Sequence, residues 1–282
     1  MPLRLPSGYR CIVNLGCDFD AIALWIGSYG LSSPSYMHRG EFGARVGVPR
    51  VLGLLKKYNI KATWCIPGHS IETFPDVVNQ IIKEGHEIAH HGYIHENPTK
   101  LTREQEAKFI DMGIDAIKSV TGRKPRGYRS PYWDYSQNTL ELLLERGFEW
   151  DSSLMGNDFT PYYLRKNDGP ALLDKPYHFG EPTSILEIPV SWYLDDFPVQ
   201  EYMGSLVPWV MQDPDVIFRR WTAIFDYMYE NVPGGVLTLT THPQTIGRAH
   251  MITMLERVIQ HINSRPGVLW ATLSEIRDMW VD

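Results

Sequence analysis

The sequence predicts an α/β fold in which seven or eight strand–helix units form a distorted (β/α) barrel. Two observations lead to this prediction. Short runs of apolar and β-branched residues alternate with longer stretches whose apolar residues recur three and four positions apart, as is typical of a largely parallel sheet. No internal repeat, low-complexity tract or long Gly/Ser linker divides the sequence, so we expect residues 1–282 to form one domain.

The expected strands are short apolar runs bounded by turn residues or charged residues. Because helices separate most of them, these strands are expected to run parallel. In chain order, they are expected at residues 11–15, 61–66, 86–91, 185–190, 236–241 and 268–272.

Helices are expected between these strands, and several of their ends carry recognisable residues. Thr102 and Gln105 form a capping box at the start of one helix, and Gly122 ends it. One of the others is expected to hold Pro49 in its first turn, and one to cover 74–82 before Gly85. One is expected to be capped by Ser136 and ended by Gly147, and two are expected to begin near Asp213 and near Gly247.

Two long segments, 152–182 and 194–214, break this alternation. Both are rich in Pro, Gly, Asp and aromatic residues, and neither shows a helical or strand period. Loops of this length in a compact domain tend to be functional, so we expect both to roof a site.

Composition excludes several classes of partner. The formal net charge of −6 argues against nucleic acid or an anionic membrane surface. The three cysteines include no Cys-x-x-Cys pair, so neither a disulfide framework nor a structural zinc site is expected. No apolar stretch has the length of a signal peptide or a membrane span, which predicts a cytoplasmic protein.

Two aspartates follow the first expected strand. In extended backbone, residues two apart point the same way, so the carboxylates of Asp18 and Asp20 can both face the mouth of a barrel. Strand ends of this kind carry catalytic residues in barrels. The alternative is a turn in which one aspartate caps a helix.

Four histidines lie within ten residues, and two interpretations compete. His86 and His90 match the H-E-x-x-H pattern of zinc proteases, which requires a helix, whereas the flanking glycines leave room only for a short strand. His91 and His95 lie just after that strand, where the chain can turn. With a carboxylate they can hold one divalent ion and leave a position for water, which would make His86 and His90 structural.

Two further charged residues lie at strand ends. His242 ends the 236–241 strand, directly before a proline, and can reach into the mouth of the barrel. Arg129 lies in the segment 126–133. Taken alone, His242 could be a core residue whose ring nitrogens are hydrogen-bonded, and Arg129 could be part of a surface salt bridge.

Together these segments resemble the polysaccharide deacetylase superfamily, the NodB-homology carbohydrate esterases. The resemblance covers most of the chain and involves five motifs in the expected order, which makes it more specific than any single motif. The motifs are Asp18 with Asp20, the H-x-x-x-H of 91–95, the R-x-P-Y of 129–132, the aromatic segment 192–196 and the L-x-x-H of 239–242.

One departure from the family pattern narrows the resemblance. The usual first motif has adjacent aspartates followed by Gly, whereas here Phe19 separates them and Ala21 follows. This spacing, with the residues at 25–30 and 95–98, is similar to a branch that includes the Helicobacter-type peptidoglycan deacetylase and is related to cyclic imidases and PuuE-type allantoinases. That branch implies a homo-tetramer.

The resemblance implies a metal-dependent hydrolase acting on a carbon–nitrogen amide bond. It implies that Asp20, His91 and His95 bind one divalent metal ion, zinc or another divalent transition metal. It further implies that Asp18 acts as the base and that Arg129 keeps it ionised. A backbone N–H near Tyr132 would stabilise the oxyanion, and His242 would protonate the leaving nitrogen.

The substrate is expected to be a glycan or a small molecule that contacts Tyr132, Trp133, Trp192 and either Asp195 or Asp196. The family favours removal of acetyl from an N-acetylated sugar of the peptidoglycan type. The missing export signal and the aromatic residues of the loops favour a small cyclic amide, such as a cyclic imide or allantoin. A catalytically inactive carbohydrate-binding barrel is the alternative from another class. The loop aromatics are Trp192, Tyr193, Phe197, Tyr202 and Trp209.

Overall fold

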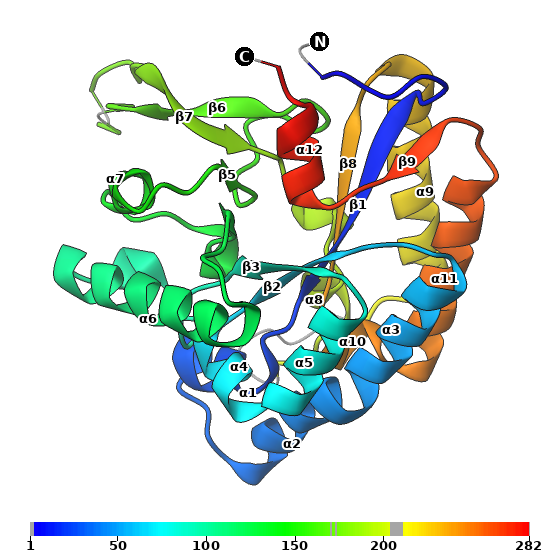
Figure 1. Cartoon of the computed structure of the whole chain (residues 1–282), viewed down its shortest axis with the longest axis horizontal. Helices are drawn as coiled ribbons and strands as arrows, with labels where there is room; N and C mark the ends of the chain where they lie inside the picture. The colour runs from blue at the N-terminus through cyan, green and yellow to red at the C-terminus, as the bar shows by residue number, and fades with distance from the viewer. Residues whose placement is uncertain (1–2, 170, 173, 204–210, 282) are drawn as a thin grey trace.

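A strongly curled sheet forms the centre of the molecule (Figure 1). The structure is a computed structural model that describes residues 3–169, 171–172, 174–203 and 211–281. The strands of this described part are β1 (Cys11–Asp18), β2 (Thr63–Ile66), β3 (Glu87–His90), β4 (Gly127–Tyr128), β5 (Trp150–Asp151), β6 (Tyr162–Lys166), β7 (Glu181–Glu187), β8 (Val236–Thr241) and β9 (Val268–Trp270).

The strand order is β6-β7-β5-β4-β3-β2-β1-β8, and β9 pairs with the first residues of β1. All pairs are parallel except β6 with β7. The sheet curls into a half-barrel whose end strands, β6 and β8, do not pair with each other within the described residues. The predicted distorted barrel is therefore confirmed. Its parallel strands bring the carboxyl ends of β1, β3, β4 and β8 to one rim.

Helices connect most of these strands and cover the outer face of the sheet (Figure 1). Short helical turns also lie at residues 24–28, 43–47, 98–100, 131–133 and 192–194. The α-helices are α1 (Ala21–Ala23), α2 (Pro34–Phe42), α3 (Val48–Lys57), α4 (Gly68–Thr73), α5 (Pro75–Lys83), α6 (Arg103–Thr121), α7 (Thr139–Glu145), α8 (Phe197–Gln200), α9 (Pro214–Asn231), α10 (Pro243–Ile246), α11 (Ala249–Asn263) and α12 (Leu273–Met279).

The predicted ends of α6 are confirmed. The capping box of Thr102 and Gln105 is present, and Gly122 takes a left-handed conformation with φ of 73°. The prediction that Ser136 caps the next helix is wrong. Asn138 precedes α7, because the Ser136 hydroxyl, which donates to the buried carboxylate of Glu106 at 2.5 Å, accepts from the N–H of Asn138 at 2.9 Å and not from a backbone N–H within the helix.

The helix with Pro49 in its first turn is part of a longer helical run. This run begins at Pro34 and passes through a π-helical turn at residues 43–47 before α3. The turn presses Gly47 against α10, where a Cβ on Gly47 would lie 2.1 Å from the Pro243 carbonyl oxygen. Residues 34–47 follow no regular apolar period, so the pattern identified only α3.

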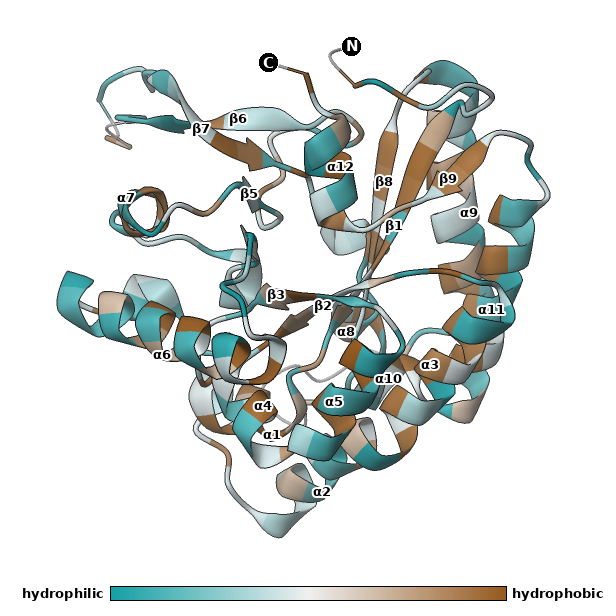
Figure 2. Ribbon diagram, in the orientation of Figure 1, coloured by the Kyte–Doolittle hydropathy of each residue, from teal (hydrophilic) through white to brown (hydrophobic). Residues whose placement is uncertain are grey.

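The two largest hydrophobic clusters pack on opposite faces of the sheet. The larger lies between its outer face and helices that include α3, α9 and α11. The smaller fills the concave side, where Ile276 and Trp280, in and just after α12, pack against Ile12 and Trp150. Figure 2 shows β1 and β8 as apolar and the outer surfaces of α6 and α11 as polar. In the described part of the chain, no helix is both long and apolar enough to cross a membrane.

Candidate active site

A small pocket opens at the rim where the carboxyl ends of the strands meet. Its volume is about 80 Å³. Even-numbered residues of β1 point to the concave side with Ile12, so the last of them, Asp18, reaches this pocket. The pocket is lined by Asp18, Asp20, Leu24, Tyr29, His91, His95, Tyr132, Trp133, Trp192, Asp195, Phe197 and His242.

Asp20, His91 and His95 come together in the pocket. The Asp20 Oδ1 atom lies 3.5 Å from His91 Nε2, and Oδ2 lies 3.7 Å from His95 Nε2. Both Asp20 oxygens are buried and have no hydrogen-bond partner among the described residues. An unpaired buried carboxylate is costly, and burial raises the pKa of Asp20 well above its usual value. A cation would remove that cost.

These three side chains fit a divalent ion. Ligands about 2.0–2.1 Å from a tetrahedral centre lie about 3.3–3.4 Å from one another, which is close to the two distances above. Both histidines are fully or almost fully buried, and burial lowers the pKa of His91 to about 4. They are therefore neutral imidazoles, the form that binds metals.

The tautomers of both histidines direct Nε2 to Asp20. His91 Nδ1 donates to the carbonyl oxygen of Arg129 at 2.7 Å, so its Nε2 carries the lone pair. The Ser28 hydroxyl donates to the His95 carbonyl at 2.9 Å, which leaves Ser28 Oγ as the acceptor for His95 Nδ1 at 2.5 Å. Such contacts orient metal-binding imidazoles.

The zinc-protease interpretation of His86 and His90 is wrong because these residues flank and end the strand β3, not a helix. His90 Nε2 donates to the Ile110 carbonyl at 3.0 Å, while Nδ1 accepts from Gly92 N–H at 3.1 Å. Neither nitrogen of His90 is left for a metal. His86 Nδ1 accepts from the N–H of Ala62. Both residues are structural.

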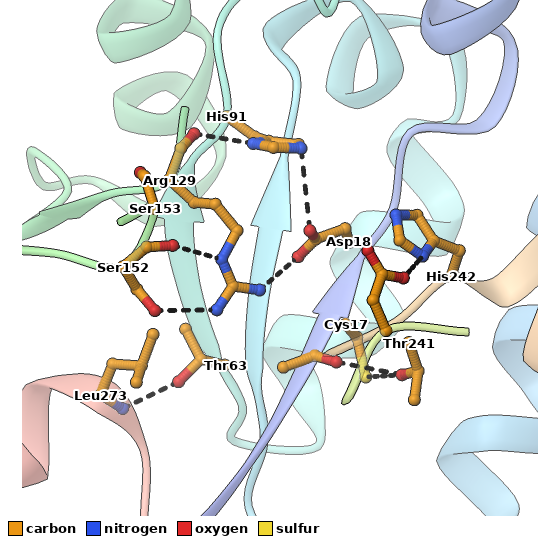
Figure 3. A network of polar contacts seen from close by, with 12 residues as sticks. Cys17, Asp18, Thr63, His91, Arg129, Ser152, Ser153, Thr241, His242 and Leu273 are labelled. Atoms are coloured by element: carbon orange, nitrogen blue, oxygen red, sulfur yellow. Dashed lines mark hydrogen bonds and ion pairs between the residues drawn. The ribbon is translucent and has the colours of Figure 1, made fainter. Parts of the chain in front are cut away.

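Asp18 and Arg129 form a buried ion pair beside His91, one of the three metal-ligand candidates (Figure 3). Arg129 Nη1 donates to Asp18 Oδ1 at 2.7 Å, and Asp18 Oδ2 lies 3.9 Å from His91 Nε2. Burial by itself raises the pKa of Asp18, but the Arg129 guanidinium lowers it below the usual value. Asp18 is therefore ionised and can accept a proton. The surface salt bridge considered for Arg129 is excluded, since this residue is fully buried.

Arg129 is fixed by the turn after β5 and by a glycine in β1. Its Nε donates to the Ser152 carbonyl at 2.9 Å, and Nη2 donates to the Ser152 hydroxyl at 3.0 Å (Figure 3). A Cβ on Gly16 would lie 2.8 Å from Arg129 Nη1. Glycine at position 16 therefore leaves the room that the guanidinium occupies.

Two buried carboxyl groups support this turn. Glu187 Oε1 accepts from the N–H groups of Ser153 and Leu154 at 3.0 and 2.9 Å, and Asp151 accepts from the Ser153 hydroxyl at 2.8 Å. Ser153 Oγ in turn accepts from the N–H of Ser130, next to Arg129. Burial and the neighbouring Asp151 raise the pKa of Glu187 well above its usual value.

His242 is held by Asp196 on the other side of the pocket. Its Nδ1 lies 2.8 Å from Asp196 Oδ1, and its backbone N–H donates to the same carboxylate at 3.0 Å. His242 Nε2 then faces Asp20 at 3.7 Å. Burial alone lowers the pKa of His242, but Asp195 and Asp196 raise it well above the usual value. His242 is therefore a protonated group that can donate, and not a neutral core residue.

The sequence left open whether Asp195 or Asp196 supports the site, and the structure gives them different positions. Asp196 holds His242, whereas Asp195 lines the pocket and lies 3.4 Å from His242 Nδ1. Asp195 forms a parallel bridge with Thr240, which sets the segment beside the end of β8. The sequence offered Asp196 only as an alternative to Asp195, and the Asp-Asp pair itself was the available signal.

Aromatic residues form the mouth of the pocket. The rings of Trp133 and Trp192 lie 4.4 Å apart between centroids, and Trp192 is 43% exposed. Tyr132 and Trp133 have positive φ values of 63° and 51°, a conformation that costs about 1–3 kcal/mol per residue and that clusters at functional sites. This bend brings both side chains to the pocket.

The two long segments contribute unequally to the pocket. Segment 194–214 contributes Asp195 and Phe197, while Tyr193 and Tyr202 are exposed. Trp209 lies outside the described residues. The prediction that 152–182 also roofs the site is wrong, because its described residues do not line the pocket. This segment instead contains β6, which extends the sheet antiparallel to β7.

Comparisons with known proteins identify the family. A family model described as polysaccharide deacetylase matches residues 41–150. The peptidoglycan deacetylase of Helicobacter pylori is 43% identical over 95% of both chains. A putative polysaccharide deacetylase from Mycobacterium smegmatis is 32% identical with a TM-score of 0.87, covering 99% of this chain and 93% of its own. The Puue allantoinase structure has the same fold, at 23% identity and a TM-score of 0.80 over 98% and 92%. The chain belongs to the polysaccharide deacetylase family.

Proposed function

We propose that this chain is a metal-dependent hydrolase that removes the acetyl group from an N-acetylated sugar of the peptidoglycan type. One observation carries this proposal. Three metal-ligand candidates lie between an ionised carboxylate, Asp18, and a protonated imidazole, His242. Amide hydrolysis needs this combination of a base for water and an acid for the leaving nitrogen.

Asp20, His91 and His95 would hold the metal, which we propose to be zinc or another divalent transition metal. A divalent ion bound there supplies Lewis-acid polarisation of the amide carbonyl and makes an attacking water more acidic. Two imidazoles and one carboxylate form a ligand set typical of catalytic zinc sites, which keep one position open.

The remaining steps belong to the side chains on either side. Asp18 takes a proton from the attacking water, and Arg129 keeps Asp18 ionised and fixed by their 2.7 Å contact. The water oxygen adds to the carbonyl carbon, and an N–H near Tyr132 stabilises the developing oxyanion. His242 then gives its proton to the nitrogen as the carbon–nitrogen bond breaks. The products are acetate and the free amine.

The size of the pocket supports an acetyl group as the part that is enclosed. A volume of about 80 Å³ is well below the roughly 300–1,000 Å³ of pockets that enclose a drug-sized ligand. A whole hexosamine does not fit, so the sugar ring would lie at the mouth. There the partly exposed Trp192 and its neighbour Trp133 offer apolar faces, together with Tyr132, and Asp195 offers a carboxylate.

The same volume favours a second candidate substrate, a small cyclic amide such as a cyclic imide or allantoin. A five-membered ring is smaller than the sugar ring of a glycan, so less of the substrate would lie outside the pocket. In that reaction the ring opens, and acetate is not released.

Turnover by the zinc-loaded protein distinguishes these candidates. Acetate release is measured with N-acetylglucosamine, chitooligosaccharides and peptidoglycan fragments, and ring opening with succinimide, hydantoin and allantoin. Asp18→Asn serves as the inactive control. Acetate release that Asp18→Asn abolishes supports deacetylation, and ring opening alone replaces it with the second candidate. Glycan binding by the metal-loaded protein without any turnover would identify a carbohydrate-binding barrel and refute both.

A cytoplasmic location and a homo-tetramer remain predictions. Cell fractionation tests the first, and light scattering on the purified protein tests the second.

A further inference from the structure

We propose that Tyr29 is a substrate-binding residue whose hydroxyl donates a hydrogen bond to a hydroxyl oxygen of the N-acetylated sugar. The inference rests on the proposed deacetylase function and assigns a role to a residue outside the five sequence motifs. Its basis is the position of Tyr29 in the pocket, the rigidity of the segment that carries it, and a hydroxyl that the described part of the protein does not use.

Tyr29 lines the same pocket as Asp20 and His95. Its ring lies 6.1 Å from the ring of Tyr132 and 6.1 Å from the ring of Trp25, measured between centroids. Tyr29 therefore packs against two aromatic neighbours and lines the cavity.

The segment before Tyr29 is tied to the segment that carries His95. Ser28 contacts His95 through two hydrogen bonds, and the Ser28 carbonyl accepts from the Tyr132 hydroxyl at 2.7 Å. A Cβ on Gly27 would lie 1.7 Å from the Ile94 carbonyl oxygen, so the two backbones touch. The Tyr29 hydroxyl is thus fixed relative to the metal-ligand candidates, as a specificity group must be.

The hydroxyl of Tyr29 has no hydrogen-bond partner among the described residues, whereas that of Tyr132 is used by Ser28. Burial, and then the neighbouring Tyr132 and Asp20, raise the pKa of Tyr29. The phenol therefore stays protonated and remains a donor. A half-buried donor on a residue that lines a pocket can donate its hydrogen bond to the ligand that the pocket binds.

The ring contact with Tyr132 places Tyr29 beside the part of the pocket where the proposed function puts the sugar. There Tyr132, Trp133 and Trp192 would face the sugar ring. The amine half of an N-acetylated sugar carries hydroxyl groups, so the substrate beside Tyr29 would offer hydroxyl oxygens as acceptors.

Tyr29→Phe tests this role because it removes only the hydroxyl. Tyr193→Phe is the matched control, since Tyr193 lies near the mouth but is 69% exposed and does not line the pocket. Zinc-loaded proteins are assayed with N-acetylglucosamine and with N-cyclohexylacetamide, whose amine half is a six-membered ring without oxygen. Zinc content and Tm are measured for each variant, and both should match the parent protein.

We expect Tyr29→Phe to raise KM for N-acetylglucosamine about threefold to tenfold, the effect of one neutral hydrogen bond. Its kcat should stay within about twofold, its KM for N-cyclohexylacetamide should not change, and Tyr193→Phe should match the parent. Calorimetric titration of N-acetylglucosamine into Asp18→Asn and into Asp18→Asn/Tyr29→Phe should show the same loss of affinity. Equal KM values for Tyr29→Phe and parent on N-acetylglucosamine overturn the inference alone. A parent protein that neither cleaves nor binds N-acetylated sugars overturns the proposed function and, with it, the inference.

Discussion

Asp196→Asn should move the alkaline limb of the pH–rate profile to lower pH. Asp196 touches neither the pocket nor the metal-ligand candidates, and it acts on the reaction only through His242, at 2.8 Å from Nδ1. An asparagine can still accept one hydrogen bond, from Nδ1 or from the backbone N–H. It cannot supply the negative charge that stabilises the imidazolium.

The size of the shift follows from that contact. A hydrogen bond to a charged group contributes about 1.5–3 kcal/mol, and a pKa unit corresponds to about 1.36 kcal/mol. The pKa of His242, which Asp195 and Asp196 raise in the folded protein, should therefore fall by about 1–2 units. The general acid must be protonated to act. In Asp196→Asn, activity should therefore decline at a pH about 1–2 units lower than in the parent protein.

The assay is acetate release by the zinc-loaded protein from pH 5 to 10, for the parent, Asp196→Asn, His242→Ala and the double variant. His242→Ala should keep its zinc and lose about 10²–10⁴-fold in kcat, the usual contribution of a general acid. In that background, Asp196→Asn should add no further loss, since the two residues act as a unit. An unshifted alkaline limb, or a large additional loss in the double variant, would refute this assignment.

Two further predictions concern the support of the site. Arg129→Met leaves the buried Asp18 carboxylate without its partner, which should cost about 3–5 kcal/mol of unfolding free energy, measured by urea denaturation; a change below about 1 kcal/mol contradicts the buried pair. Glu187→Gln should flatten the loss of stability that begins as pH rises above the usual glutamate pKa. The raised pKa of Glu187 means that its protonated form stabilises the fold at acidic pH and that this contribution is lost as pH rises through the folded-state pKa. Tm measured from pH 5 to 9 tests this, with the exposed Glu181→Gln as control; parallel curves for Glu187→Gln and the parent contradict it.

The sequence predicted the parts of the site that depend on regular structure. Asp18 follows the alternation of β1, and His242 ends β8, so parallel strands bring them to the same rim. The glycines that bound β3 argued against a helix at His86 and His90, and the structure shows the strand. These inferences need only local periodicity and the rule that parallel strands end together.

The residues that the sequence did not identify depend on contacts between distant segments. Asp195 and Asp196 are chemically identical, and only the bridge to Thr240 decides which of them meets His242. Tyr29 follows a π-helical turn that has no distinctive apolar pattern. The strand β6 was missed because its apolar and polar residues lie in a segment rich in Pro, Gly and Asp, where pairing with β7 and not local propensity selects the strand.

Metal content tests the central claim most directly. Purified parent, His91→Ala and the exposed control His38→Ala are loaded with zinc, dialysed, and measured by inductively coupled plasma mass spectrometry. The account predicts one equivalent of zinc in the parent and in His38→Ala, and a loss of most of it in His91→Ala, because only two of the three ligands remain. A full equivalent of zinc in His91→Ala, or none in the parent, would contradict the assignment of Asp20, His91 and His95 as the metal site.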